Sequence, residues 1–114
     1  MSKDFELFKE EFKRWQVKFG LGGYYVYFKH EPIDNFADIH INQEQMTATV
    51  RVDSEVAEED KPFRDIRATA KHEAVHLLVG RLEKSACRQD RHVSSSEMYE
   101  ATEELVNKLV SLIQ

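Results

Sequence analysis

The sequence is short of the residues that mark several large classes of protein. It has one cysteine in 114 residues, so no disulfide can form within the chain, which agrees with a reducing compartment. The longest apolar run, around residues 75–79, is far too short to cross a bilayer. The N-terminus is charged where a signal peptide would be apolar. We therefore expect a cytoplasmic protein with no membrane partner.

The chain also lacks an excess of positive charge. Its 16 lysine and arginine residues are outnumbered by 21 acidic residues, giving a net charge of −5, and the basic residues are scattered. This pattern argues against nucleic acid as the main partner. Hydrophobic residues make up 41% of the chain and no repeat or linker interrupts it, so we expect a single domain over residues 1–114.

Hydrophobic periodicity predicts a helix followed by three strands. Aromatic residues recur at spacings of three and four over residues 4–19, which is typical of an amphipathic helix, and Gly20 is a suitable end. Residues 24–28 are rich in strand formers. Residues 36–42 and 46–53 alternate apolar and polar positions and predict a hairpin. Together these segments predict a small, mainly antiparallel three-stranded sheet.

Two further helices follow in the prediction. Pro62 suits the first turn of a helix that should run to about Glu83, because Gly80 weakens its end. Residues 84–93 are polar and predict a loop. The segment Ser94–Glu97 resembles a capping box that starts a last amphipathic helix. The fold class expected is α+β, with the helices on one face of the sheet.

A metal-binding pattern lies inside the first of these two helices. His72 and His76 are four residues apart, so a helix directs both imidazoles to one side, with Glu73 beside the first. Two neutral imidazoles suit Zn²⁺, which in catalytic sites takes three protein ligands and leaves one position for water. A carboxylate at Glu73 is placed to take a proton from that water.

At His72-Glu73-Ala74-Val75-His76 the chain resembles the zincin metallopeptidases. It departs from the metzincin extension, since Val79 and Leu82 stand where that group has glycine and a third histidine. It is more similar to the gluzincins, and among them to compact, often phage- or prophage-borne peptidases of about this length. The resemblance implies a bound Zn²⁺, general-base catalysis by Glu73, and a peptide or protein substrate lying along an edge strand.

The gluzincin arrangement requires a third ligand from the last helix. Glu103 borders the apolar stripe of that helix, whereas Glu100 lies well inside its polar face. We therefore rank Glu103 first as the metal ligand and keep Glu100 as the alternative, since related compact families often place the ligand just before a small residue. Tyr99 and His92 flank the start of the helix and are candidate donors to the oxyanion of the reaction.

Other interpretations of the same residues stay open. The chain could be a non-catalytic binding or regulatory protein of zincin fold with a structural metal, since a small domain has little room for a substrate cleft. It could also be a metal-free helical interaction protein. His30 and His40 are expected at the surface, and Cys87 as a plain surface thiol rather than a metal ligand or switch. The sequence gives no oligomeric state.

Overall fold

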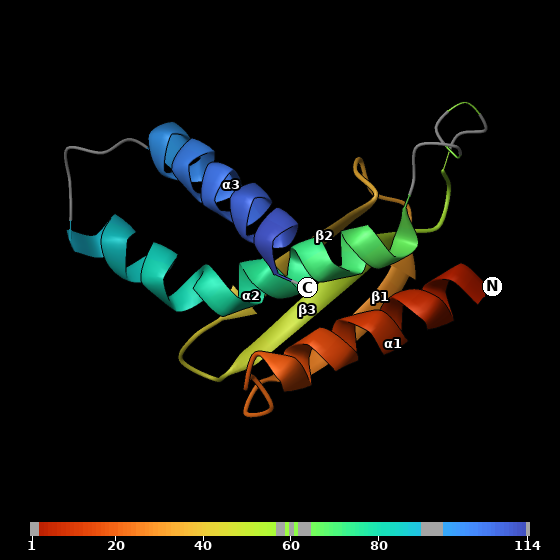
Figure 1. Ribbon diagram of the computed structural model, residues 1–114, viewed down its shortest axis with the longest axis horizontal. Helices are drawn as coiled ribbons and strands as arrows, with labels where there is room; N and C mark the ends of the chain where they lie inside the picture. The colour runs from red at the N-terminus through yellow and green to blue at the C-terminus, as the bar shows by residue number, and fades with distance from the viewer. Residues whose placement is uncertain (1–2, 57–58, 60, 62–64, 90–94, 114) are drawn as a thin grey trace.

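The chain folds as a helix, three strands and two helices, which confirms the α+β class. The computed structural model describes residues 3–56, 59, 61, 65–89 and 95–113. Its elements are α1 (Lys3–Lys18), β1 (Tyr25–Glu31), β2 (Ala37–Asn42), β3 (Thr47–Asp53), α2 (Ile66–Gln89) and α3 (Ser95–Leu112) (Figure 1). Pro62 and Phe63, where the second helix was expected to begin, lie outside the described residues.

The three strands form a mixed sheet in the order β1-β3-β2. The predicted hairpin is confirmed, because β2 pairs antiparallel with β3. However, β1 pairs parallel with β3, so the expectation of a mainly antiparallel sheet was wrong for that pair. Burial places β3 between the other two strands, because its Ala48, Val50 and Val52 are at most 2% exposed. The chain reverses direction after β1 and again after β2, so β3 runs parallel to β1. Tyr25 and Tyr27 of β1 are more than half exposed and suit an edge strand.

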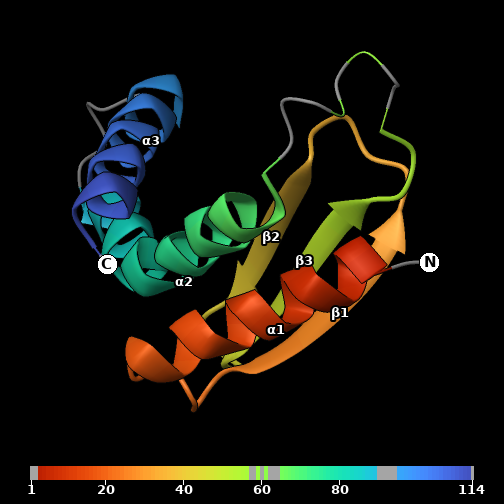
Figure 2. The same ribbon diagram turned by 45° about the vertical axis from the view of Figure 1, so that its right-hand side comes forward.

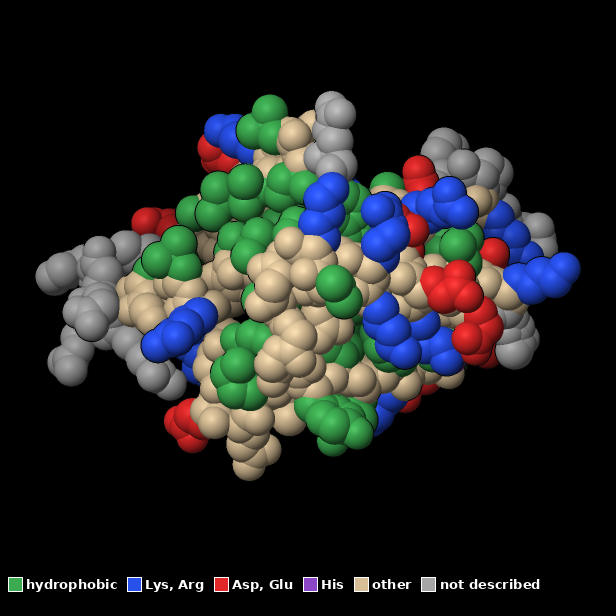
Figure 3. All heavy atoms as spheres, turned by 60° about the horizontal axis from the view of Figure 1, so that its bottom comes forward, with side chains coloured by type: hydrophobic (Ala, Val, Ile, Leu, Met, Phe, Trp, Pro, Cys, Tyr) green, Lys and Arg blue, Asp and Glu red, His purple; other side chains and the backbone are tan. Residues whose placement is uncertain are grey.

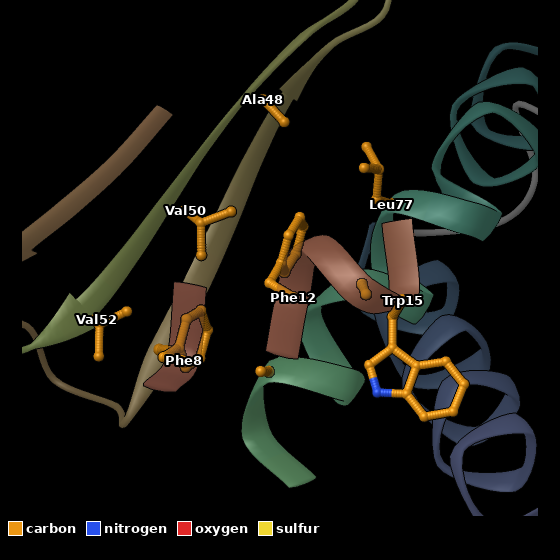
Figure 4. Packing of buried hydrophobic residues seen from close by; sticks show 10 residues of the cluster. Phe8, Phe12, Trp15, Ala48, Val50, Val52 and Leu77 are labelled. Carbon is orange, nitrogen blue, oxygen red and sulfur yellow. The ribbon is translucent and has the colours of Figure 1, made fainter. Parts of the chain in front are cut away.

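The main core lies between the sheet and the helices α1 and α2, which cover the same face of it (Figure 2). The aromatic stripe of α1 supplies its largest side chains. Phe8, Phe12 and Trp15 are at most 4% exposed. They pack with Val50 of β3 and Leu77 of α2 (Figure 4). Burying each such side chain contributes about 1.5–3 kcal/mol, so this core fixes α2, and the residues it carries, against the sheet.

Helix α2 continues through residues that were predicted to form a loop. Lys84 to Gln89 are helical, so the expected end near Glu83 was wrong. Gly80 does not end the helix but lets it lie close to β2. A Cβ at this position would lie 2.8 Å from Cδ1 of Ile41 and 3.1 Å from Nε2 of Gln43. Its missing side chain therefore allows the edge strand to approach the helix.

Helix α3 packs on α2 rather than on the sheet, which corrects the expectation that all helices share one sheet face. Val75 and Val79 of α2 enclose Val106 of α3 in a second, smaller cluster. The C-terminal end of α3 is held by Lys71 of α2. Its ammonium donates a hydrogen bond of 2.7 Å to the carbonyl oxygen of Val110 and another to that of Ile113. It also lies 4.9 Å from the ring centre of Trp15.

The outer surface carries charges of both signs. On the face shown in Figure 3, lysine and arginine side chains lie in several separate groups, with acidic side chains beside some of them. None of the helices in the described ranges has the length and apolar character needed to span a membrane. The cytoplasmic location and the exclusion of nucleic acid stay predictions.

Candidate metal centre

Helix α2 places His72 and His76 one above the other on a single face. They are one helical turn apart, and their ring centres are separated by 4.9 Å. Val75 and Val79 on the same helix pack against α3, so the two histidines border the interface between these helices. The packing brings a third residue to them from α3, Glu103. Glu103 is one turn before the buried Val106, which explains why its side chain points across the interface.

The three side chains are close enough to share one metal ion. Nε2 of His76 lies 3.2 Å from Oε1 of Glu103, and Nε2 of His72 lies 3.5 Å from Oε2. One ligand atom from each residue can be chosen so that all lie within 4.8 Å of one another. Tetrahedral zinc with bonds of about 2.0–2.2 Å separates its ligand atoms by roughly 3.3–3.6 Å. The two histidine–glutamate distances, which involve one oxygen of the carboxylate each, are close to this range, so the three residues could hold a metal ion of this kind.

The group is sheltered without being closed off from solvent. The side chains of His72, His76 and Glu103 are 27%, 16% and 26% exposed. A structural zinc site is usually closed by four protein ligands, whereas a catalytic site keeps a position open. The described residues bring together three such ligands. The partial exposure agrees with access for a small molecule from one side.

The surroundings of His72 favour its neutral imidazole, which is the form that binds metal. The pKa of His72 is lowered, first because burial disfavours its charged form and second because a charge on His76 would repel it. The carboxylate of Glu103 partly offsets both effects. At neutral pH His72 therefore has its ring nitrogen available without first losing a proton.

Glu73 is the most unusual ionisable group near the site. It is only 6% exposed. Burial, as the largest cause, and the negative charges of Glu103 and Asp38 together raise its pKa to about 8. No described residue donates a hydrogen bond to its carboxylate. A carboxyl whose pKa lies near neutrality can both take up and release a proton under cellular conditions.

Two clefts meet at His76. One has a volume of about 260 Å³ and is lined by Glu73, His76 and Glu103, together with residues of β2, the segment before it, and α3. The other, about 400 Å³, runs between β2 and the later part of α2, and Gly80 forms part of its wall. The candidate centre is thus open to a ligand lying between the edge strand and the helices.

Of the other candidate residues in the sequence, one lines the cleft and the rest lie at the surface or outside the described part of the chain. Glu100 is exposed and is not part of the three-residue group, which contains Glu103 instead. Tyr99 is 64% exposed and lines the same cleft as Glu103, so it stays a candidate oxyanion donor. His92 and the side chain of Cys87 lie outside what the structure describes. As expected, His30 and His40 are at the surface.

Asp38 and Glu83 also line the cleft, although neither belongs to the metal-binding pattern in the sequence. The side chain of Asp38 on β2 is held by Arg51, whose Nε donates a hydrogen bond of 2.9 Å. No spacing in the sequence links Asp38 to the helix, so only the fold reveals it. Glu83 follows His76 by seven residues, or two helical turns, and that spacing could have identified it.

No protein-family model matches the sequence, and no curated protein matches it.

Proposed function

We propose that the chain is a zinc-dependent peptidase that hydrolyses peptide bonds in a peptide or protein substrate. One observation carries the proposal: His72, His76 and Glu103 converge within 4.8 Å, at a cleft that also contains the buried Glu73. The resemblance of residues 72–76 to the zincins supports the same function. His72 and His76 would hold the metal from α2, and Glu103 from α3.

A zinc ion held by these residues would supply positive charge to activate water and to polarise the carbonyl of the scissile bond. Glu73 takes a proton from the attacking water and passes it to the nitrogen of the leaving amine. The hydroxyl part of the water adds to the carbonyl carbon, the bond from carbon to nitrogen breaks, and both products are complete without another reactant.

Burial prepares Glu73 for this role. Its raised pKa shows that the carboxylate is poorly stabilised by its surroundings in the metal-free protein. A nearby cation lowers the pKa of such a group, which would leave Glu73 charged and basic at neutral pH. The partly buried cleft limits competing solvent and strengthens the electrostatic effects within it.

The main alternative is a binding or regulatory protein of zincin fold with a structural metal. The experiment that separates the two compares hydrolysis of a mixed peptide library by zinc-loaded wild type and Glu73→Gln. Both proteins are expected to hold zinc, because Glu73 is not among the three ligands. We expect only the wild type to release new amino termini. No release from either protein at full zinc occupancy would favour the non-catalytic alternative, and equal release from both would overturn the role of Glu73.

A further inference from the structure

Glu83 lies beyond the candidate metal centre on the same face of α2 as His76. The offset of seven positions corresponds to about 10 Å along the helix and returns to nearly the same face. Long side chains on a helix lean toward its N-terminus, which directs Glu83 back toward His76. Glu83 lines both clefts that meet at His76, and also an apolar cleft of about 160 Å³ between α2 and α3.

The cleft of about 260 Å³ is strongly acidic. Its described lining residues include four carboxylates, from Asp38, Glu73, Glu83 and Glu103. They include one histidine but no lysine or arginine. Lys84 lines only the cleft beside β2. Glu73 as a residue is only 6% exposed, and no described residue donates a hydrogen bond to its carboxylate. The acidity therefore belongs to a cleft that reaches a buried carboxylate, and not merely to an acidic outer surface.

Three of these carboxylates already have an assigned partner or role. Asp38 is paired with Arg51, Glu103 lies against the two histidines, and Glu73 is the proposed base. No described lysine or arginine lies within ion-pair distance of Glu83. Glu83 is consequently the carboxylate in this cleft that is left to meet a positive charge brought by a ligand.

The opposite side of the cleft offers a surface for the rest of a basic side chain. Tyr99 of α3 lines it, and this residue is 64% exposed. A phenol ring attracts a guanidinium or ammonium group over its face and also packs against the aliphatic part of the chain.

We propose that this cleft is a specificity subsite that binds a lysine or arginine side chain of the substrate through Glu83. The inference rests on the proposed function and extends it to a class of substrate. An extended peptide advances about 3.3 Å per residue, so a separation of about 10 Å places the basic residue within three positions of the cleaved bond. A peptide with acidic residues there would be repelled.

The test uses two small ligands that differ in charge alone. Arginine hydroxamate and citrulline hydroxamate carry the same zinc-chelating group, and citrulline is the uncharged near-isostere of arginine. Calorimetry with the zinc-loaded protein should give about tenfold tighter binding of the arginine compound, as one charge-assisted hydrogen bond predicts. Glu83→Gln should reduce this ratio to near one. Glu10→Gln removes the same charge from an exposed position of α1 and should keep it.

The possible failures are distinguishable. Equal affinity of the two hydroxamates in the wild type would overturn the subsite and leave the metal centre intact. A preference for arginine that persists in Glu83→Gln would overturn the role of Glu83. Absence of zinc from the protein would overturn the proposed function and this inference together. In the zinc-loaded wild type, library cleavage should also show lysine or arginine enriched within three positions of the cut bond, and no enrichment would contradict the proposal.

Discussion

Nε2 of His76 lies 3.2 Å from Oε1 of Glu103, although the two residues are 27 positions apart and belong to different helices. His72 approaches the other oxygen of the same carboxylate at 3.5 Å. The carboxylate is thus shared between two imidazoles one helical turn apart. A bound metal ion requires such a set of converging nitrogen and oxygen ligand atoms.

Glu103→Gln should weaken zinc binding strongly. The amide keeps the shape of the side chain but removes the negative charge that the metal would share with two neutral imidazoles. Loss of a residue that merely supports a ligand costs about 10–100-fold in metal affinity, and loss of a ligand should exceed that. Glu100→Gln is the matched control on the exposed side of α3 and should bind zinc as the wild type does. Competition with a fluorescent chelator measures both. Unchanged affinity in Glu103→Gln together with a loss in Glu100→Gln would refute the assignment of the third ligand.

The metal-free protein should become less stable as pH rises from about 4.5 to about 8. The pKa of Glu73 is raised by folding from 4.5 to about 8, so the native state binds more protons than the unfolded state in this window. Below pH 4.5 the carboxyl is neutral in both the folded and the unfolded state, and above pH 8 the folded protein must hold a buried charge. Across this window the free energy of unfolding should fall by the order of a few kcal/mol. Urea unfolding at several pH values in the presence of a chelator measures it.

Glu73→Gln provides the control for this pH dependence. The amide does not titrate, so the free energy of unfolding of the variant should depend much less on pH between pH 4.5 and 8. Near pH 8 the variant should be more stable than the wild type. An identical slope in the two proteins would assign the dependence to other groups.

Lys71→Met should destabilise the packing of α3. Methionine keeps much of the apolar length of the lysine side chain but cannot donate a hydrogen bond. The variant therefore loses the two hydrogen bonds that the charged ammonium of Lys71 donates to the carbonyl oxygens of Val110 and Ile113. Hydrogen bonds of this kind contribute about 1.5–3 kcal/mol each, and the cation near Trp15 is lost as well. Chemical unfolding should show the loss, and zinc affinity should fall because Glu103 is on the released helix. Lys108→Met, at an exposed lysine of α3, is the control. Equal stability of the two variants would show that the Lys71 contacts contribute nothing.

Much of the fold follows from local patterns in the sequence. The aromatic spacing in α1 has the period of a helix, and the alternation in β2 and β3 has the period of a strand. All three elements form where their period predicts them. The parallel pairing of β1 does not follow, because it depends on β3, and not the next strand β2, lying beside β1 in the folded chain. The place of Gly80 inside α2 does not follow either, because this glycine permits a close approach to Ile41, a residue remote in sequence.

The candidate site divides in the same way. His72, Glu73 and His76 are recognisable from helical spacing, and Glu103 from its place beside the apolar stripe of α3. Asp38 reaches the site only because β2 forms the sheet edge beside α2. The high pKa of Glu73 likewise arises from burial and from two carboxylates on other elements, neither of which a local pattern contains.

The zinc content of the protein purified without chelator tests the central claim most directly. We predict one zinc per chain in the wild type and none in His72→Ala or His76→Ala. Since zinc binds the folded state alone, saturation to 100 times its dissociation constant should stabilise the wild type by about 2.7 kcal/mol and leave the histidine variants unchanged. A zinc content near zero in the wild type, not restored by added zinc, would contradict the account.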